Sequence, residues 1–275
     1  MIRIGVKPFV VGGYTPTDAD ALAFVNAASI SNDTQKLAIN TLVTDLKGYG
    51  VWAKMRAIYP FVGGTSSTHK WNLKDPRDLD VAFRLVFSGG WTHSSTGALP
   101  NGTNAFADTF LTPNTSLTQN STHVSYYSRT NITSNTGVEF GSWHTSYAYG
   151  IEFAIYRNTV NKTYCVINTG GGTATILAAA TTPTTGFYIG NRTASNNGSM
   201  FKNNTKIATN TNSVTATLSG FKLYLGASND FGTASAFSNK QCAFASIGDG
   251  LTDTESANLY TAVQAYQTIL NRAVV

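Results

Sequence analysis

Two glutamates are the first candidates for chemistry in this chain of 275 residues. Glu139 and Glu152 lie in or beside segments that we expect to be strands. A retaining glycosidase needs two carboxyl groups about 5–5.5 Å apart, one acting as the acid and the other as the nucleophile. Glu139 and Glu152 could face each other across neighbouring strands, but a glutamate on the solvent side of a strand is the commoner arrangement. We therefore expect a protein that is not an enzyme.

Aromatic and histidine side chains form a second candidate group. They are expected in or beside loops, and exposed aromatic rings stack on sugar faces as they do on other flat apolar surfaces. Most aromatic residues of a β-protein are instead core or inter-subunit contacts, so both interpretations stay open. The candidate glycan contacts are Trp91, His93, Trp143, His144, Tyr147 and Tyr149.

A short acidic cluster is the first place to look for a metal site. Asp75, Asp78 and Asp80 could together offer oxygen atoms to Ca²⁺, which takes six to eight such ligands. Lys74 and Arg77 lie between these aspartates. A local turn with surface ion pairs is therefore the expected structure.

The remaining possible metal ligands are scattered. Asn229, Asp230 and Asp249 are expected in loops, but their spacing matches no calcium motif that we recognise. A zinc site needs closely spaced ligands, which the histidines do not offer. We expect neither a metal nor another cofactor. The four histidines are His69, His93, His123 and His144.

Composition favours a folded β-protein with an uncharged polar surface. Hydrophobic residues make up 42% of the chain, aromatic residues 12% and charged residues only 12%. Abundant aromatic residues favour strands and argue against disorder. The net charge of +5 includes no run of Lys and Arg, so nucleic acid is not an expected partner. Cys165 and Cys242 are expected to be buried free thiols.

Membrane and export signals are not evident in the sequence. The chain has no apolar stretch near the ~20 residues of a membrane span. Lys7 and Pro8 interrupt the extended, apolar run from Ile2 to Val11, so we expect no secretory signal.

Residues 1–62 are expected to form an extended and then helical segment. Thr15–Asp18 is a helix-start signature that places the carboxylates of Asp18 and Asp20 in the first turn. A second helix start follows at Asn32, with Gln35 at capping-box spacing. The apolar residues of 39–46 recur at helical intervals, and Gly48 and Gly50 are expected to end that helix. Val51–Tyr59 is expected to add one more helical piece.

Residues 63–250 are expected to form an antiparallel β-sandwich or jelly roll. Short apolar segments separated by turn residues are typical of these folds. A tight hairpin is expected at Asn203 and Asn204. Residues 251–275 should close the chain with a helix that starts at Thr252 or Asp253 and packs on the sandwich. The expected strands are Asp80–Phe87, Ile151–Tyr156, Thr163–Ile167, Phe187–Ile189, Ser199–Phe201, Lys206–Ala208, Phe221–Leu225 and Cys242–Ser246.

The stretch from Phe187 to Tyr260 resembles the second half of a laminin-G-like, concanavalin A-like domain. Three phrases occur in the family's order, although Asn204 replaces a customary glycine and the Glu-x-Asp-x-x-Glu pattern of laminarinase-type members is absent. The resemblance implies two packed antiparallel sheets. The phrases are Met200–Ala208, Leu223–Ala227 and Ser246–Tyr260.

A second resemblance concerns Ser67–Gly90, which is similar to laminin-G-like proteins of tailed bacteriophages. This likeness would span residues 16–272 and implies a component of the virion, on the head or the tail. We therefore expect a structural protein of the phage particle surface that docks on other virion proteins and on copies of itself. Its helical segment would be the anchor.

Two alternatives to the structural function stay open. One is an adhesin that binds host or environmental glycans through rim loops. The other, less favoured, is a glycan-cleaving enzyme. In each case we expect synthesis in the host cytoplasm without a signal peptide and no membrane partner.

Overall fold

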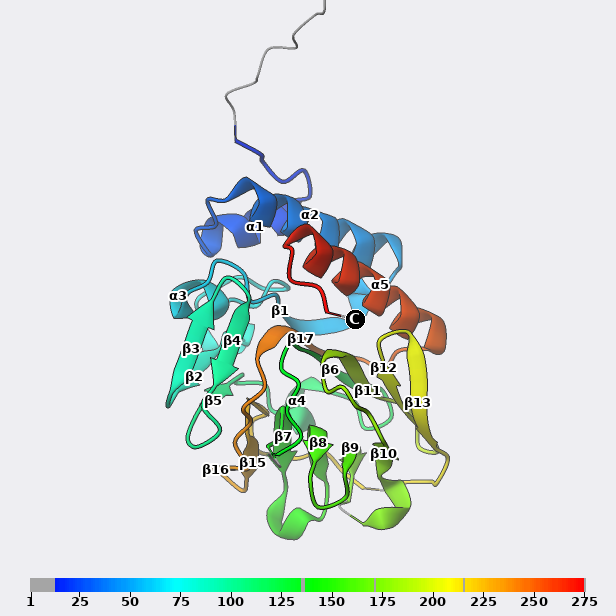
Figure 1. Cartoon of the computed structure of the whole chain (residues 1–275). Coiled ribbons are helices and arrows are strands. Elements are labelled where there is room, and N and C mark those ends of the chain that lie inside the picture. The colour runs from blue at the N-terminus through cyan, green and yellow to red at the C-terminus, as the bar shows by residue number, and fades with distance from the viewer. Residues whose placement is uncertain (1–12, 135–136, 171, 215, 275) are drawn as a thin grey trace, which may run out of the picture.

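The structure is a computed structural model that describes residues 13–134, 137–170, 172–214 and 216–274. Within these residues two largely antiparallel sheets pack face to face, and helices cover the outer side of the first sheet (Figure 1). The fold is mainly β, a sandwich with a C-terminal helix, as the sequence predicts. The extended run expected at 2–11 lies outside the described residues.

The first sheet has eight strands among the described residues, with β6 and β17 at its centre. One edge of β17 pairs with β6, and its other edge pairs with β4 and then with β1. The strand order is β13 (Thr205–Asn210), β12 (Asn197–Lys202), β11 (Gly186–Ala194), β6 (Thr122–Ser128), β17 (Cys242–Gly248), β4 (Gly97–Pro100) and β3 (Trp91–Ser94), with β1 (Met55–Tyr59) also on β17.

The second sheet has nine strands among the described residues and lies farther from the helices (Figure 1). A short hairpin, β15 (Ser228–Asp230) with β16 (Thr233–Ser235), joins it through a parallel contact between β15 and β7. The order of the other strands is β10 (Leu177–Ala179), β9 (Lys162–Thr169), β8 (Gly150–Arg157), β7 (Phe140–Trp143), β14 (Tyr224–Leu225), β5 (Phe106–Asp108) and β2 (Val86–Ser88).

The first sheet is buried on both faces. On β6, Tyr126 belongs to the core between the sheets, whereas its neighbour Tyr127 belongs to the core under the helices. On β11, Tyr188 faces the second sheet and Phe187 faces the helices. Strands with two buried faces lose the alternation of polar and apolar residues. The helices cover the outer face of the first sheet, so the sheet face that is not covered by helices is the outer face of the second sheet.

Three longer helices form the layer above the first sheet. They are α1 (Ala19–Ala27), α2 (Asp33–Gly48) and α5 (Asp253–Ile269). The helix start at Asn32 is as predicted, because its side chain accepts from Gln35. Asp18, expected in the first turn, is instead the N-cap of α1 and accepts from Asp20 and Ala21. Thr252 and Glu255 form a capping box. The shorter helical pieces are α3 (Ser66–His69), α4 (Pro113–Ser116), η1 (Trp52–Lys54), η2 (Asp80–Ala82), η3 (Thr145–Tyr147) and η4 (Thr173–Thr175).

The helical segment shares a core with the sandwich. Leu42 and Val43 of α2 belong to one apolar cluster with Leu259 and Val263 of α5 and with Phe244 of β17. The apolar side of α2 is thus already covered within the chain. If the segment anchors the protein, it does so through the sides that face away from this core.

Two expectations for local structure are wrong. Met55–Tyr59 is the strand β1 rather than a helical piece, because the open edge of β17 pairs with its backbone. The strand expected at Asp80–Phe87 is wrong over most of its length, and only its last two residues belong to β2. A turn occupies Asp80–Ala82, and Phe83 has a positive φ of 58°. Arg84 pairs with Asp80 four residues earlier, and Tyr59 donates to the carbonyl of Phe83, so local and tertiary contacts override the alternating pattern.

Other local expectations are confirmed. The β12–β13 hairpin turns at Asn203, whose φ is 52°, a conformation that asparagine tolerates better than most residues. Cys165 and Cys242 are buried and free. Both thiols have a raised pKa because burial penalises the thiolate.

Candidate functional site: a pocket on the outer face of the second sheet

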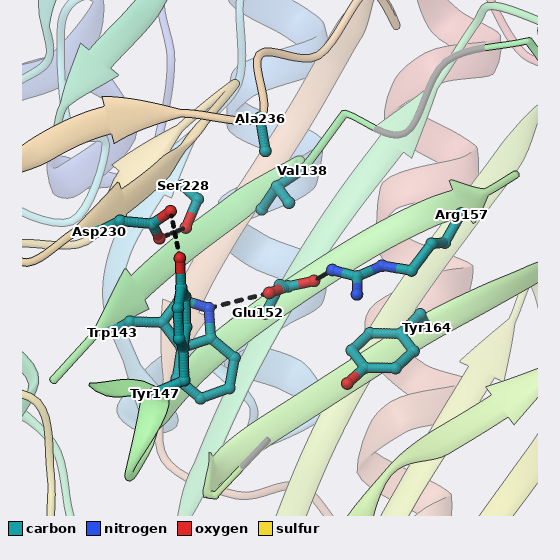
Figure 2. Close-up of a pocket in the computed structure, with 9 residues that line it drawn as sticks. All are labelled: Val138, Trp143, Tyr147, Glu152, Arg157, Tyr164, Ser228, Asp230 and Ala236. Atoms are coloured by element: carbon teal, nitrogen blue, oxygen red, sulfur yellow. Dashed lines mark hydrogen bonds and ion pairs between the residues drawn. The ribbon is translucent and has the colours of Figure 1, made fainter. Parts of the chain in front are cut away.

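A pocket of about 450 Å³ opens on the face of the second sheet that points away from the helices. Strand alternation creates this face. On β8, Ile151, Phe153 and Ile155 point into the core, so Glu152 between them points outward. The β15–β16 hairpin borders the pocket on the β7 side, with Asp230 opposite Trp143. The lining residues are Val138, Trp143, Tyr147, Glu152, Arg157, Tyr164, Ser228, Asp230 and Ala236 (Figure 2).

Glu152 is fixed at the centre of the pocket wall by two partners. The indole nitrogen Nε1 of Trp143 donates to Oε2 of Glu152 over 2.8 Å. Arg157 forms an ion pair with Oε1 (Figure 2). Trp143 is 2% exposed and Glu152 is 6% exposed. The carboxylate is therefore held in one orientation, and its charge is balanced by Arg157.

Arg157 is itself engaged on two sides. Its guanidinium carbon lies 4.2 Å from the centre of the Tyr164 ring, which is a cation–π geometry. Burial raises the pKa of the Tyr164 hydroxyl, and the positive charge of Arg157 acts in the opposite direction. One face of the Tyr164 ring is thus covered, and the arginine is committed to Glu152 and to this ring.

Asp230 forms the opposite wall and is held by hydroxyl groups. Tyr147 Oη donates to Oδ2 over 3.1 Å, and Ser235 Oγ donates to the same atom over 2.5 Å. Ser228 Oγ donates to Oδ1 over 2.5 Å. Asp230 takes part in none of the ion pairs formed by the described residues. Its carboxylate is therefore oriented by neutral donors while its charge is left unpaired.

Tyr147 is the exposed aromatic ring of the site. Its side chain is 48% exposed, and it meets Trp143 edge to face with 5.5 Å between ring centres. Phe231 supports it in the same way at 5.0 Å. Ser146 and Tyr147 both have positive φ, 57° and 54°, which is costly for residues with a Cβ. Burial and the nearby Asp230 charge raise the pKa of Tyr147, which keeps its hydroxyl a donor at neutral pH.

The chemistry of the pocket is that of polar recognition beside an aromatic ring. Asp230 offers carboxylate oxygens that can accept hydrogen bonds from hydroxyl groups, and the largely buried carboxylate of Glu152 forms part of the facing wall. Tyr147 offers an apolar surface next to them. All three are held by neighbouring side chains, so little ordering is needed when a ligand binds.

The six aromatic and histidine candidates separate into three places. Trp143 and Tyr147 line the pocket, although Trp143 was expected to be exposed and is buried. His144 and Tyr149 stack on each other at 4.3 Å and are not lining residues. Trp91 and His93 lie on β3 of the other sheet. Their rings pack against Phe87 and, for His93, also against His69.

Both glutamates differ from the expected solvent-facing position, because both are buried. Glu139 is fully buried; it accepts from the Ile155 backbone and from Ser238, and it pairs with Lys240. A carboxylate can be buried only where polar or charged partners surround it. Strand alternation alone does not show that such partners are present.

Sequence reasoning missed three contributors to the pocket. Arg157 and Tyr164 were not considered as site residues, and Asp230 was considered only as a loop ligand for calcium. One signal was present: Glu152 alternates with the apolar residues of β8, which places it on the outer face. No local pattern indicated that Asp230 lies close to Trp143, because β15 is about 80 residues away from β7 along the chain.

The acidic cluster forms surface ion pairs, as expected. Asp75 pairs with Arg77, and Asp78 pairs with both Lys70 and Arg84. Within the part of the chain that the structure describes, no group of three or more His, Cys, Asp or Glu side chains is placed to hold a metal ion. No described helix has the length and apolar character required to cross a bilayer.

Comparison with known proteins identifies the fold. No family model matches the chain, and no curated protein matches it significantly in sequence. A mutant sialidase of Trypanosoma rangeli with trans-sialidase activity is similar over 84% of this chain, with a TM-score of 0.53 and 11% identity. Botulinum neurotoxin type C is similar over 78%, with a TM-score of 0.50 and 10% identity.

These likenesses cover limited parts of the longer proteins, 39% of the sialidase chain and 52% of the toxin chain. The CBM40 module of the Ruminococcus gnavus IT-sialidase is similar over 48% of this chain and 78% of its own, with a TM-score of 0.37 and 15% identity. At such identities the comparisons establish a β-sandwich fold. They do not establish a function.

Proposed function

We propose that this protein binds glycans in the pocket of the second sheet. The observation that carries the proposal is the half-exposed ring of Tyr147, which lies beside two immobilised carboxylates, Glu152 and Asp230. A sugar ring presents an apolar face of C–H groups and a rim of hydroxyl groups. The pocket offers a matching surface for each.

The proposal also agrees with how small-ligand sites are built. Such sites combine aromatic walls with a few placed polar groups and occupy roughly 300–1,000 Å³. The volume of about 450 Å³ suits one or two sugar rings. The structure of botulinum neurotoxin type C, which has the same fold, is described by its interaction with two ganglioside molecules. Gangliosides are sialylated glycolipids, so this likeness supports glycan binding by the fold in general and not a particular charge of the glycan.

We propose binding without cleavage. A glycosidase needs one carboxylic acid that can donate a proton and a second carboxylate that is free to act. Glu152 is tied to Trp143 and Arg157, and Asp230 accepts from three hydroxyl groups. Glu139 is buried away from the pocket surface. These engaged carboxylates suit recognition better than turnover.

The setting that we propose for this binding is the surface of a phage particle. The support is the resemblance of Ser67–Gly90 to laminin-G-like proteins of tailed bacteriophages. Mass spectrometry of purified particles from the source phage would detect the chain if it is a virion component. Its absence from intact particles would contradict this setting.

A glycan array followed by calorimetric titration tests the binding site. We expect Tyr147→Ala to weaken binding of the best glycan by about fivefold or more, since stacking on an aromatic ring contributes about 1 kcal/mol or more. Glu152→Gln should also weaken it. Tyr49→Ala is the matched control, because Tyr49 is 41% exposed and follows α2 on the helical side. Unchanged affinity in Tyr147→Ala would rule out this pocket.

A further inference from the structure

The pocket has an uneven charge balance. Three of its nine lining residues are charged, namely Glu152, Arg157 and Asp230. Arg157 and Glu152 form an ion pair and cancel each other. Asp230 remains, so the lining carries a formal charge of −1 at neutral pH.

Among the residues that the structure describes, no cation forms an ion pair with Asp230. Its partners are the neutral hydroxyl groups of Tyr147, Ser228 and Ser235. Hydroxyl donors orient a carboxylate, but they leave its net charge in place. Two like charges within a few ångströms of each other in a partly enclosed site repel more strongly than they do in water.

The charge of Arg157 is already offset inside the pocket. Its Nη2 group is paired with Glu152, and its planar face lies over Tyr164. A ligand anion would therefore meet a neutral ion pair rather than an unpaired cation. Separating the pair to free the cation would leave Glu152 poorly exposed and uncompensated, which is expensive.

The charge of the whole chain points in the opposite direction. The net charge of +5 would by itself favour acidic ligands weakly and from a distance. Lys162 lies across from Arg157 in the β8–β9 register, but it is exposed and is not a lining residue. Local and global charge thus make different predictions about the ligand.

We propose that the pocket selects glycans without acidic groups. This inference rests on the proposed glycan-binding function and names its ligand class: neutral sugars and amino sugars bind, whereas sialylated, uronic and sulfated sugars are rejected. Asp230 is the residue that determines this selectivity, through repulsion of anions and through acceptance of hydroxyl or ammonium donors.

The test uses paired glycans on one array, each neutral glycan beside its sialylated, uronic or sulfated counterpart, with the full chain as the probe. We expect the neutral member of a pair to bind at least about tenfold more tightly than the acidic member. Asp230→Asn keeps the shape of the side chain and should narrow this ratio several-fold. Asp45→Asn on α2 makes the same change in net charge far from the pocket and should leave the ratio unchanged.

Salt dependence provides a second measurement on the unmodified protein. Raising the salt concentration from about 0.05 M to about 0.5 M screens the repulsion, so the acidic member should gain affinity relative to the neutral one. A preference for the acidic member, or a ratio that Asp230→Asn leaves unchanged, would overturn the selectivity and leave the glycan site in place. Absence of binding to every glycan would overturn the proposed function itself.

Discussion

Gly141 on β7 lies directly under Ser228 on β15, so close that a Cβ added to Gly141 would be 2.5 Å from the Cα of Ser228. This contact lets β15 lie against β7, which brings Asp230 opposite Trp143. Gly141 also pairs with Glu152 across the β7–β8 register. One glycine thus permits the approach that brings the two carboxylate-bearing walls together.

Gly141→Ala is expected to remove glycan binding while the sandwich still folds. The methyl group must push β15 away, and overpacking of this kind costs about 1–3 kcal/mol. Displacement of β15 moves Asp230 out of the pocket. Thermal unfolding and glycan titration measure the two effects. Gly48→Ala is the control, since a Cβ there meets nothing within 4 Å. Full affinity in Gly141→Ala would show that the position of β15 does not matter to binding.

Removing only one charge of the buried pair of Glu139 and Lys240 is expected to destabilise the fold strongly. Both side chains are fully buried, with Nζ 3.6 Å from Oε1 of Glu139. Glu139→Gln leaves the ammonium group uncompensated and should reduce the free energy of unfolding by about 3–5 kcal/mol. Lys240→Met added to Glu139→Gln should recover much of this loss, because no buried charge then remains. Urea unfolding of the single and double variants checks the coupling, and purely additive losses would refute it.

Two buried histidines are expected to make the fold sensitive to acid. Burial lowers the pKa of His123 from 6.5 to about 4 and that of His69 from 6.5 to about 3. Between pH 6.5 and these values the unfolded chain binds more protons than the folded one. Stability is therefore complete above pH 6.5 and falls as the pH drops toward 4.

The size of the acid effect and its origin can be measured. A pKa difference of 2.5 corresponds to about 3 kcal/mol for His123. In the neutral ring Nδ1 donates to the Asp249 carbonyl over 2.6 Å, and Nε2 lies 3.1 Å from Ser246 Oγ. His123→Gln should flatten the dependence of the melting temperature on pH between 4 and 6.5. An unchanged slope in this variant would mean that other groups control acid unfolding.

Arg272 is expected to hold the C-terminal segment against the sandwich. Its guanidinium donates to the carbonyls of Pro60, Phe61 and Ala243 at 2.7–2.9 Å, and it is nearly fully buried. Arg272→Met removes one donor from each of these carbonyls, of which Pro60 and Ala243 keep a second donor from Tyr266 and Gln267, and should cost about 2–4 kcal/mol. Arg77→Met, which removes an exposed ion pair, should cost much less. Equal losses in the two variants, measured by denaturant unfolding, would contradict this function of Arg272.

Much of the fold could be predicted from local patterns. The caps at Asp18, Asn32 and Thr252 have side chains that bond to nearby backbone, so their signals lie within four residues. β8 and β9 were predicted near their observed bounds because they carry long apolar runs. The pattern at Asp80–Phe87 predicted the wrong element up to Leu85, since contacts with Tyr59 and with the backbone of Lys70 decide the conformation there.

The candidate site could be predicted only in part. Trp143 and Tyr147 were named from their aromatic character, and Glu152 from its carboxylate. Their grouping with Asp230 and Arg157 was not foreseen, nor was the separate location of Trp91 and His93 on the other sheet. Residue type indicates what a side chain can bind, but several aromatic residues of the same type serve as packing here.

The sequence by itself determined the class of fold and the presence of helices before and after the sandwich. It also determined the kinds of side chain available for recognition. These follow from propensity, capping and strand periodicity, which act over a few residues. Only the tertiary structure decided which of these side chains meet. The contact of β15 with β7 and the burial of Glu152 depend on strand pairing between distant segments, and such pairing is set by the packing of the whole core rather than by any local pattern.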